Sequence, residues 1–61
     1  MTPILTIVLE PEGDQLDLRQ GSSLIIVPSG ASTPVRCWLS GEGPTLALHI
    51  DTTEVEQVRI D

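Results

Sequence analysis

Apolar residues occur along this chain in short runs that are separated by clusters of turn-forming residues. The runs are rich in Ile, Leu and Val and span residues 4–9, 15–19, 24–27, 35–39 and 46–50. Between them lie segments of Pro, Gly, Ser and acidic residues, most clearly 10–14 and 28–34, which are typical of turns and loops. Runs this short, spaced about ten residues apart, predict β-strands.

Alternation of polar and apolar residues within the runs supports strands. Residues 15–19 alternate with a period of two, as expected of a strand with one face in water. In 46–50 the side chains of Leu46, Leu48 and Ile50 share one face. In 35–39 one face carries Val35, Cys37 and Leu39 and the other Arg36 and Trp38, and we expect the second face to be the wet one.

The tail, residues 51–61, fits two structures. Thr53 and Glu56 have the spacing of a capping box, and Val55 and Val58 have helical spacing. The tail is also rich in β-branched residues, and Val58 and Ile60 alternate as in a strand. We favour a strand, with a short helix as the alternative.

These patterns predict an all-β fold of one domain, residues 1–61, with five or six antiparallel strands in a small barrel or sandwich. A chain of 61 residues buries only about 60% of its unfolded surface. It has one Trp, no Phe or Tyr, and a single cysteine, so its core is aliphatic and has no internal disulfide. We therefore predict a homodimer, with exchanged strands as one possible form.

Net charge narrows the range of partners. Nine acidic residues stand against three arginines and no lysine, which gives a formal net charge of −6. This balance disfavours nucleic acid and anionic membranes, both of which are bound through Lys and Arg. The acidic surface serves solubility alone or attracts a basic protein partner. Residues 4–9 are too few to cross a bilayer, and no signal-peptide pattern precedes them, so we expect a cytoplasmic protein.

No set of residues in the sequence has the composition of an enzyme or metal site, and we predict no catalytic residue, no cofactor and no metal. Cys37 is expected to be a half-buried apolar filler, with a symmetric disulfide between two copies as the alternative. His49 is expected to be an ordinary strand histidine, rather than a general base or a pH switch. The carboxylates around Gly13 are interpreted as a solvated turn and not as a calcium site; they are Glu10, Glu12, Asp14 and Asp17.

Trp38 and Arg36 are the predicted partner-binding residues. Both belong to the residue types that are most enriched at interface hot spots, and both lie on the face of 35–39 that we expect to be wet. An exposed Trp on so small a protein indicates a contact surface. We therefore predict a non-catalytic, acidic protein-interaction module with a regulatory role, which self-associates and binds a protein partner.

Two fragments resemble the carbon storage regulator family, CsrA and RsmA. The opening Ile4-Leu5-Thr6 is similar to that family's first strand, and the order of Val35-Arg36, Gly43-Pro44 and Leu48-His49 is similar to its later segments. The resemblance implies an intertwined β dimer that binds RNA and acts as a post-transcriptional regulator. The family has two arginines where this chain has Ile7 and Val8, and an arginine and a glutamate where it has Ile50 and Asp51. An RNA-binding regulator and an acidic mimic of nucleic acid are the alternative functions.

Overall fold

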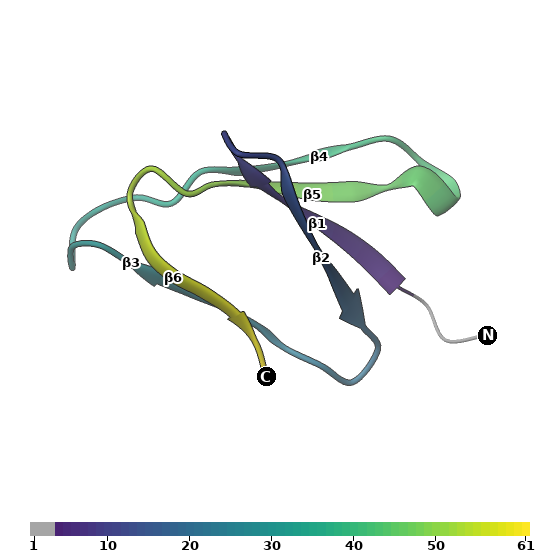
Figure 1. The fold of residues 1–61 in the computed structure, drawn as a ribbon, viewed down its shortest axis with the longest axis horizontal. Helices are drawn as coiled ribbons and strands as arrows, with labels where there is room; N and C mark the ends of the chain where they lie inside the picture. Colours follow the sequence, from purple (N-terminus) through teal and green to yellow (C-terminus); the bar gives the residue numbers. More distant parts are fainter. Residues whose placement is uncertain (1–3) are drawn as a thin grey trace.

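The computed structural model describes residues 4–61 and contains six strands and one short 3₁₀ helix (Figure 1). In chain order these are β1 (Ile4–Glu10), β2 (Asp14–Arg19), β3 (Leu24–Pro28), β4 (Cys37–Ser40), η1 (Gly43–Thr45), β5 (Ala47–Asp51) and β6 (Val55–Ile60). Four strands form one sheet in the order β2-β1-β5-β4, and β3 and β6 form a second sheet. The predicted all-β fold is confirmed, as two separate sheets that are not closed into a barrel.

The centre of the larger sheet is a parallel pair, β1 with β5, whereas every other pair is antiparallel. We expected only antiparallel strands. A parallel pair requires a long connection, and β2, β3 and β4 together form that connection here. The pairing is held at its end by Thr52, whose backbone N–H and hydroxyl both donate to the carbonyl of Glu10, at 2.9 and 2.7 Å.

The tail of the chain forms β6, which pairs with β3 in a separate two-stranded ribbon. Its alternating Val58 and Ile60 lie opposite Ile26 and Leu24. Beyond the strand ends, Ser23 and Asp61 exchange backbone hydrogen bonds of 3.1 and 2.8 Å, which extends the ladder. In Figure 1 this ribbon lies on the side of the molecule away from β4.

The register divides the four-stranded sheet into an inner face, turned toward the β3–β6 ribbon, and an outer face. Residues opposite each other in a ladder share a face, so the inner face carries Leu5, Ile7, Leu9, Leu16, Leu18, Leu48 and Ile50. A crevice lined by Leu9, Val55 and Val58 marks the seam with the ribbon. Among the hydrophobic residues of the segment 4–61, only Ile7 and Ile50 are fully buried, each with 0% exposure.

The ribbon does not cover β4, and two expectations about this strand are wrong. Cys37 is exposed instead of half-buried. Leu39, on the face that we expected to be dry, is 63% exposed. Both departures have the same cause, because β4 is the edge strand of the larger sheet and lies beyond the reach of the ribbon (Figure 1).

The turn from β4 to β5 depends on Gly41, which has a φ of +75°. A Cβ at this position would lie 2.3 Å from the carbonyl oxygen of Thr45. Only glycine fits both the positive φ and this close approach. The turn continues into η1, where the Thr45 hydroxyl donates to the carbonyl of Glu42 at 2.8 Å. In residues 4–61 no helix has the length and apolar character needed to span a membrane.

Truncating Ile50 should destabilise the fold far more than truncating Leu39. Ile50→Ala removes a fully buried side chain, and we expect it to lower the free energy of unfolding by about 2–4 kcal/mol. Leu39→Ala, at the exposed edge, should change it by less than about 0.5 kcal/mol at a protein concentration that keeps the chain monomeric. Urea denaturation followed by circular dichroism measures both. Equal losses would contradict the assignment of the core.

Candidate interaction surface around Trp38

Trp38 lies on the outer face of the larger sheet and stacks on a histidine of the neighbouring strand. It is directly opposite His49 in the β4–β5 ladder, with ring centroids 5.4 Å apart and an interplanar angle of 7°. The indole nevertheless remains 45% exposed. The histidine thus supports one side of the ring and fixes its orientation, while much of the ring remains in contact with solvent.

A polar group lies near each of the two ring nitrogens of His49. The Ser40 hydroxyl oxygen lies 2.5 Å from His49 Nε2, and a Glu10 carboxylate oxygen lies 3.6 Å from Nδ1. The second distance is too long for a hydrogen bond, and Nδ1 is buried without a hydrogen-bond partner. A carboxylate beside Nδ1 favours the tautomer that carries its proton there. We therefore assign Nε2 as the acceptor of the Ser40 hydroxyl proton.

The order Ser40, His49, Glu10 is the order of a serine, a base and an orienting acid in nucleophilic catalysis. Such catalysis also needs a cavity for the substrate and donors for the developing oxyanion. None of the three hollows that we describe on residues 4–61 is lined by Ser40 or His49. The direct structural consequence of this arrangement is that Ser40 and Glu10 fix the imidazole of His49, on which Trp38 stacks.

Arg36 extends the same face of β4 by two residues. Its carbonyl accepts a 2.9 Å hydrogen bond from the backbone N–H of Asp51 on β5. Both residues line a polar hollow with Pro34, Thr53 and Glu54. Arg36 is exposed, like Trp38. The structure therefore places the two predicted partner-binding residues side by side on one exposed strand face.

Asp51 is held in its charged form by its neighbours. The Thr53 hydroxyl donates to its Oδ1 at 2.6 Å, and the Thr53 backbone N–H donates to the same oxygen at 3.0 Å. These two hydrogen bonds, and then the positive charge of Arg36, keep the pKa of Asp51 below its ordinary value of 3.8 despite the opposing effect of desolvation. Asp51 thus provides a stable negative charge beside Arg36.

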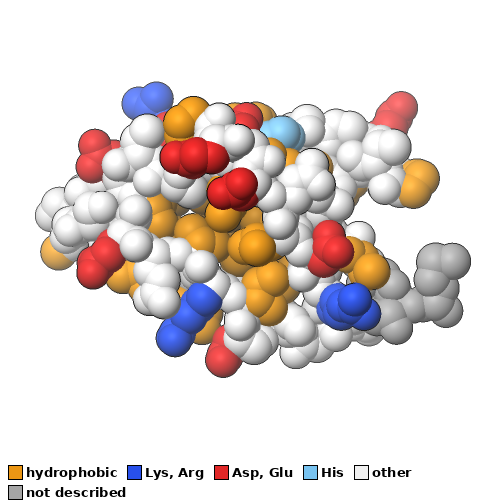
Figure 2. Space-filling view, viewed as in Figure 1, with side chains coloured by type: hydrophobic (Ala, Val, Ile, Leu, Met, Phe, Trp, Pro, Cys, Tyr) orange, Lys and Arg blue, Asp and Glu red, His pale blue; other side chains and the backbone are white. Residues whose placement is uncertain are grey.

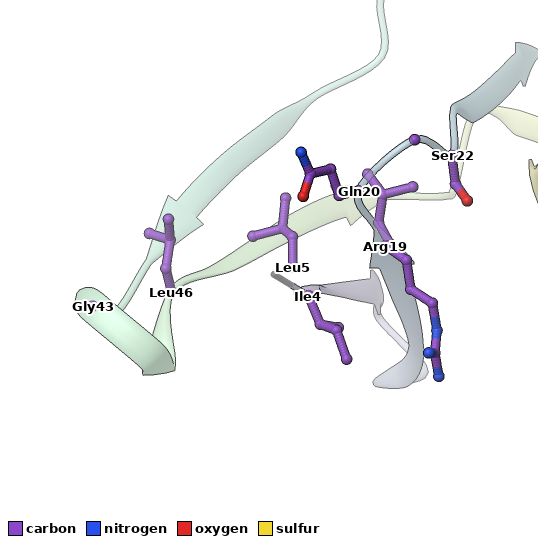
Figure 3. Close-up of a pocket in the computed structure, with 9 residues that line it drawn as sticks. Ile4, Leu5, Arg19, Gln20, Ser22, Gly43 and Leu46 are labelled. Carbon is purple, nitrogen blue, oxygen red and sulfur yellow. The ribbon is translucent and has the colours of Figure 1, made fainter. Parts of the chain in front are cut away.

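An apolar groove opens at the other end of the larger sheet (Figure 3). It has a volume of about 440 Å³ and is lined by Ile4, Leu5 and Leu18, by residues 19–22, and by Gly43 and Leu46, which precede β5. Figure 3 shows Leu5 and Leu46 on either side of the open space, while the guanidinium of Arg19 is directed away from it. Part of the inner face therefore has no cover within the described chain.

Acidic side chains surround the apolar centre of the face seen in Figure 2. In this view hydrophobic groups gather in the middle, and carboxylates and arginines lie around them. In the part of the chain that the structure describes, no group of three or more His, Cys, Asp or Glu residues could hold a metal ion. The acidic turn after β1 is exposed at Glu12 and Asp14.

Ser40 and Glu10 belong to this surface although the sequence did not reveal them. Ser40 has the same strand parity as Trp38 and Arg36, which is a signal that the sequence contains. Glu10 lies beside His49, which is 39 positions away in the chain, only because β1 and β5 pair in parallel, and no local pattern predicts that pairing.

No family model, curated protein or solved structure matches this chain.

Removing the histidine should release Trp38. We expect His49→Ala to shift the emission of the chain's single Trp to longer wavelength and to make it more accessible to acrylamide, because one side of the indole loses its cover. The stacked pair contributes about 0.5–1.5 kcal/mol beyond its buried area. Ser40→Ala keeps both rings and removes only the hydroxyl that fixes the imidazole, so it should give a smaller shift than His49→Ala. Identical spectra for all three proteins would contradict the stack.

The charge of Asp51 should depend on the Thr53 hydroxyl. Thr53→Val deletes the first of its hydrogen bonds and should raise the pKa of Asp51, whereas Thr53→Ser should leave it low. Folding lowers this pKa, so the resulting stabilisation is present above the ordinary value of 3.8 and is lost as pH falls through the folded value. An NMR titration of the Asp51 carboxyl carbon measures the shift. The hydrogen-bond assignment fails if the valine variant titrates like wild type.

Proposed function

We propose that this chain is a non-catalytic, acidic protein-interaction module that self-associates and binds a protein partner through Trp38 and Arg36. The observation that carries the proposal is the exposed indole of Trp38, which is held in a fixed orientation by His49 and has Arg36 beside it. Trp and Arg dominate binding energy at protein interfaces, and a ring that is already ordered loses little entropy on binding.

Self-association is supported by the small amount of surface that one copy buries. The chain exposes 4445 Å², whereas a folded monomer of 6.6 kDa exposes about 3,900 Å². Five large apolar side chains contribute to this exposed surface: Ile4, Trp38, Leu39, Leu46 and Ile60. A second copy would remove part of this surface from water.

The chemistry of the protein partner follows from the charges around Trp38. On the outer face Glu10 lies beside His49 and Asp51 beside Arg36, and the chain as a whole has a net charge of −6. A partner that presents an apolar side chain to the indole, flanked by Lys or Arg, would match this surface. A carboxylate on the partner could pair with Arg36.

Self-association should be visible by sedimentation. We expect a folded dimer at micromolar to hundred-micromolar concentration, in a monomer–dimer equilibrium. Because each copy carries a net charge of −6, added salt should strengthen the association by screening repulsion between the copies. Sedimentation velocity at 0.05 and 0.5 M NaCl measures both effects. A folded monomer throughout this range would remove the argument from buried surface.

Partner binding should depend on Trp38 and Arg36. We expect Trp38→Ala and Arg36→Ala to lose interacting proteins that wild type retains from the source cell, because these side chains supply the contact. Ile4→Ala, which also truncates an exposed apolar side chain but on β1, is the matched control and should retain them. Quantitative mass spectrometry of the bound fractions measures the difference.

Two outcomes would count against this site. A Trp38→Ala protein that keeps every interaction would refute the role of the indole. Retention of RNA that disappears steeply with added salt would favour instead a regulator of the type that the resemblance implies.

A further inference from the structure

The outer edge of β4 is open, and its short length of four residues is the only usual protection against edge pairing that it has. Charged side chains, proline and cover by other elements are other usual protections. The four residues of β4 are Cys37, Trp38, Leu39 and Ser40; none is charged and all four are exposed. The strand is also the last in its sheet, and Figure 1 shows no element beyond it.

The other edges of the described sheets differ from this one. β2 carries Asp14, Asp17 and Arg19, and β6 carries Glu56 and Arg59, so both edges are charged. β3 is uncharged, but its side chains are all half-buried and it ends in Pro28. In a chain with a net charge of −6, β4 is therefore the strand edge most open to another strand.

The ladder with β5 shows which backbone groups of β4 are unused. Asp51 N–H donates to the carbonyl of Arg36, so the backbone of Arg36 faces β5. Backbone groups alternate in direction along a strand. Those of Trp38 and Ser40 therefore also face β5, and those of Cys37 and Leu39 point away from the sheet.

We propose that two copies of this chain join through β4, which pairs antiparallel with β4 of the second copy about a two-fold axis at Trp38. The inference rests on the self-association proposed above and names its surface. The opposite charges at the two ends of the strand support the direction of pairing. Arg36 precedes β4 and Glu42 follows it, so antiparallel pairing brings the positive end of one strand to the negative end of the other, whereas parallel pairing would place like charges together.

The conformation of the chain selects the register. Residues that oppose each other in a continuous sheet must share a face, so the axis passes through a residue, and the two residues at the centre of β4 are Trp38 and Leu39. An axis at Leu39 would place Cys37 opposite Gly41, whose φ of +75° ends the extended strand. An axis at Trp38 uses extended residues only. It places Cys37 opposite Leu39 of the second copy, so that each pair exchanges the backbone hydrogen bonds that the monomer leaves unmade.

This pairing creates one surface from two. It brings the two Trp38 rings together at the centre of a continuous outer face, each ring still supported by its own His49. The contact surface for a protein partner is thereby doubled and becomes symmetric. A partner with two copies of the matching segment would bind it with higher avidity than a partner with one.

Leu39→Pro tests the pairing without disturbing the monomer. Proline removes the Leu39 N–H, which only the second copy would use, and proline is tolerated on an edge strand whose N–H faces solvent. We expect this variant to remain folded by circular dichroism and to dimerise at least ~10-fold more weakly than wild type in sedimentation. Leu39→Thr, which keeps the N–H, is the matched control and should stay within about threefold of wild type. Equal dimerisation by wild type and the proline variant would overturn the proposal.

Amide hydrogen exchange of the unmodified protein gives a second test that needs no variant to fold. As the concentration rises through the dimerisation range, we expect the amides of Cys37 and Leu39 to become protected, since they gain partners only in the dimer. The amides of Trp38 and Ser40, already bonded to β5, serve as internal controls. A dimer in which Cys37 and Leu39 still exchange rapidly would overturn the β4 pairing but leave self-association standing. A monomer would overturn both.

Cross-linking tests the register. In a Cys37→Ser background, Trp38→Cys places two thiols directly opposite each other, within the range of a disulfide. Oxidised glutathione, which is itself reduced to two thiols, should link this variant at least ~10-fold faster than Leu39→Cys in the same background, whose thiols are diagonal neighbours. Faster linking at Leu39 would overturn the axis at Trp38.

Discussion

The parallel pairing of β1 with β5 is the interaction on which the rest of this structure depends. It aligns Ile7 with Leu48 and Leu9 with Ile50, and so brings together the only two hydrophobic residues that the described chain buries fully, Ile7 and Ile50. The same pairing places Glu10 beside His49 on the opposite face. One ladder thus builds the core on its inner side and supports Trp38 on its outer side. A change in its register by one residue would exchange the two faces and remove both.

A thin core and an exposed edge have a common origin in the composition of the chain. Without Phe or Tyr, the ribbon of β3 and β6 is narrow and aliphatic, and it shields the inner face near Leu9 but not at Leu39. An added aromatic residue in the ribbon could have covered that area within one polypeptide. The fold instead leaves β4 uncovered and uncharged. Surface that a small protein cannot bury internally is available for contact with another chain.

Strands and faces could be predicted from the sequence because they follow from local alternation, as in residues 15–19 and 46–50. The exposure of Trp38 and its position beside Arg36 follow from the same parity. The covering of each face is not a local property: Cys37 and Leu39 are exposed because the ribbon stops short of β4, and no pattern in residues 35–39 encodes that. The Ser40–His49–Glu10 arrangement likewise depends on a parallel pair whose members are separated by most of the chain.

The place of Ile7 bears on the resemblance to the carbon storage regulators. That family has arginines where this chain has Ile7 and Val8, and here Ile7 has 0% exposure on the inner face. An arginine at this position would bury a charge without a partner, which costs several kcal/mol. Val8, the next residue, faces outward opposite His49 and is half-buried. In this architecture, position 7 therefore has to be apolar for the core to form. A basic surface on β1 would be restricted to the outer face, where Glu10 instead supports the histidine beneath Trp38.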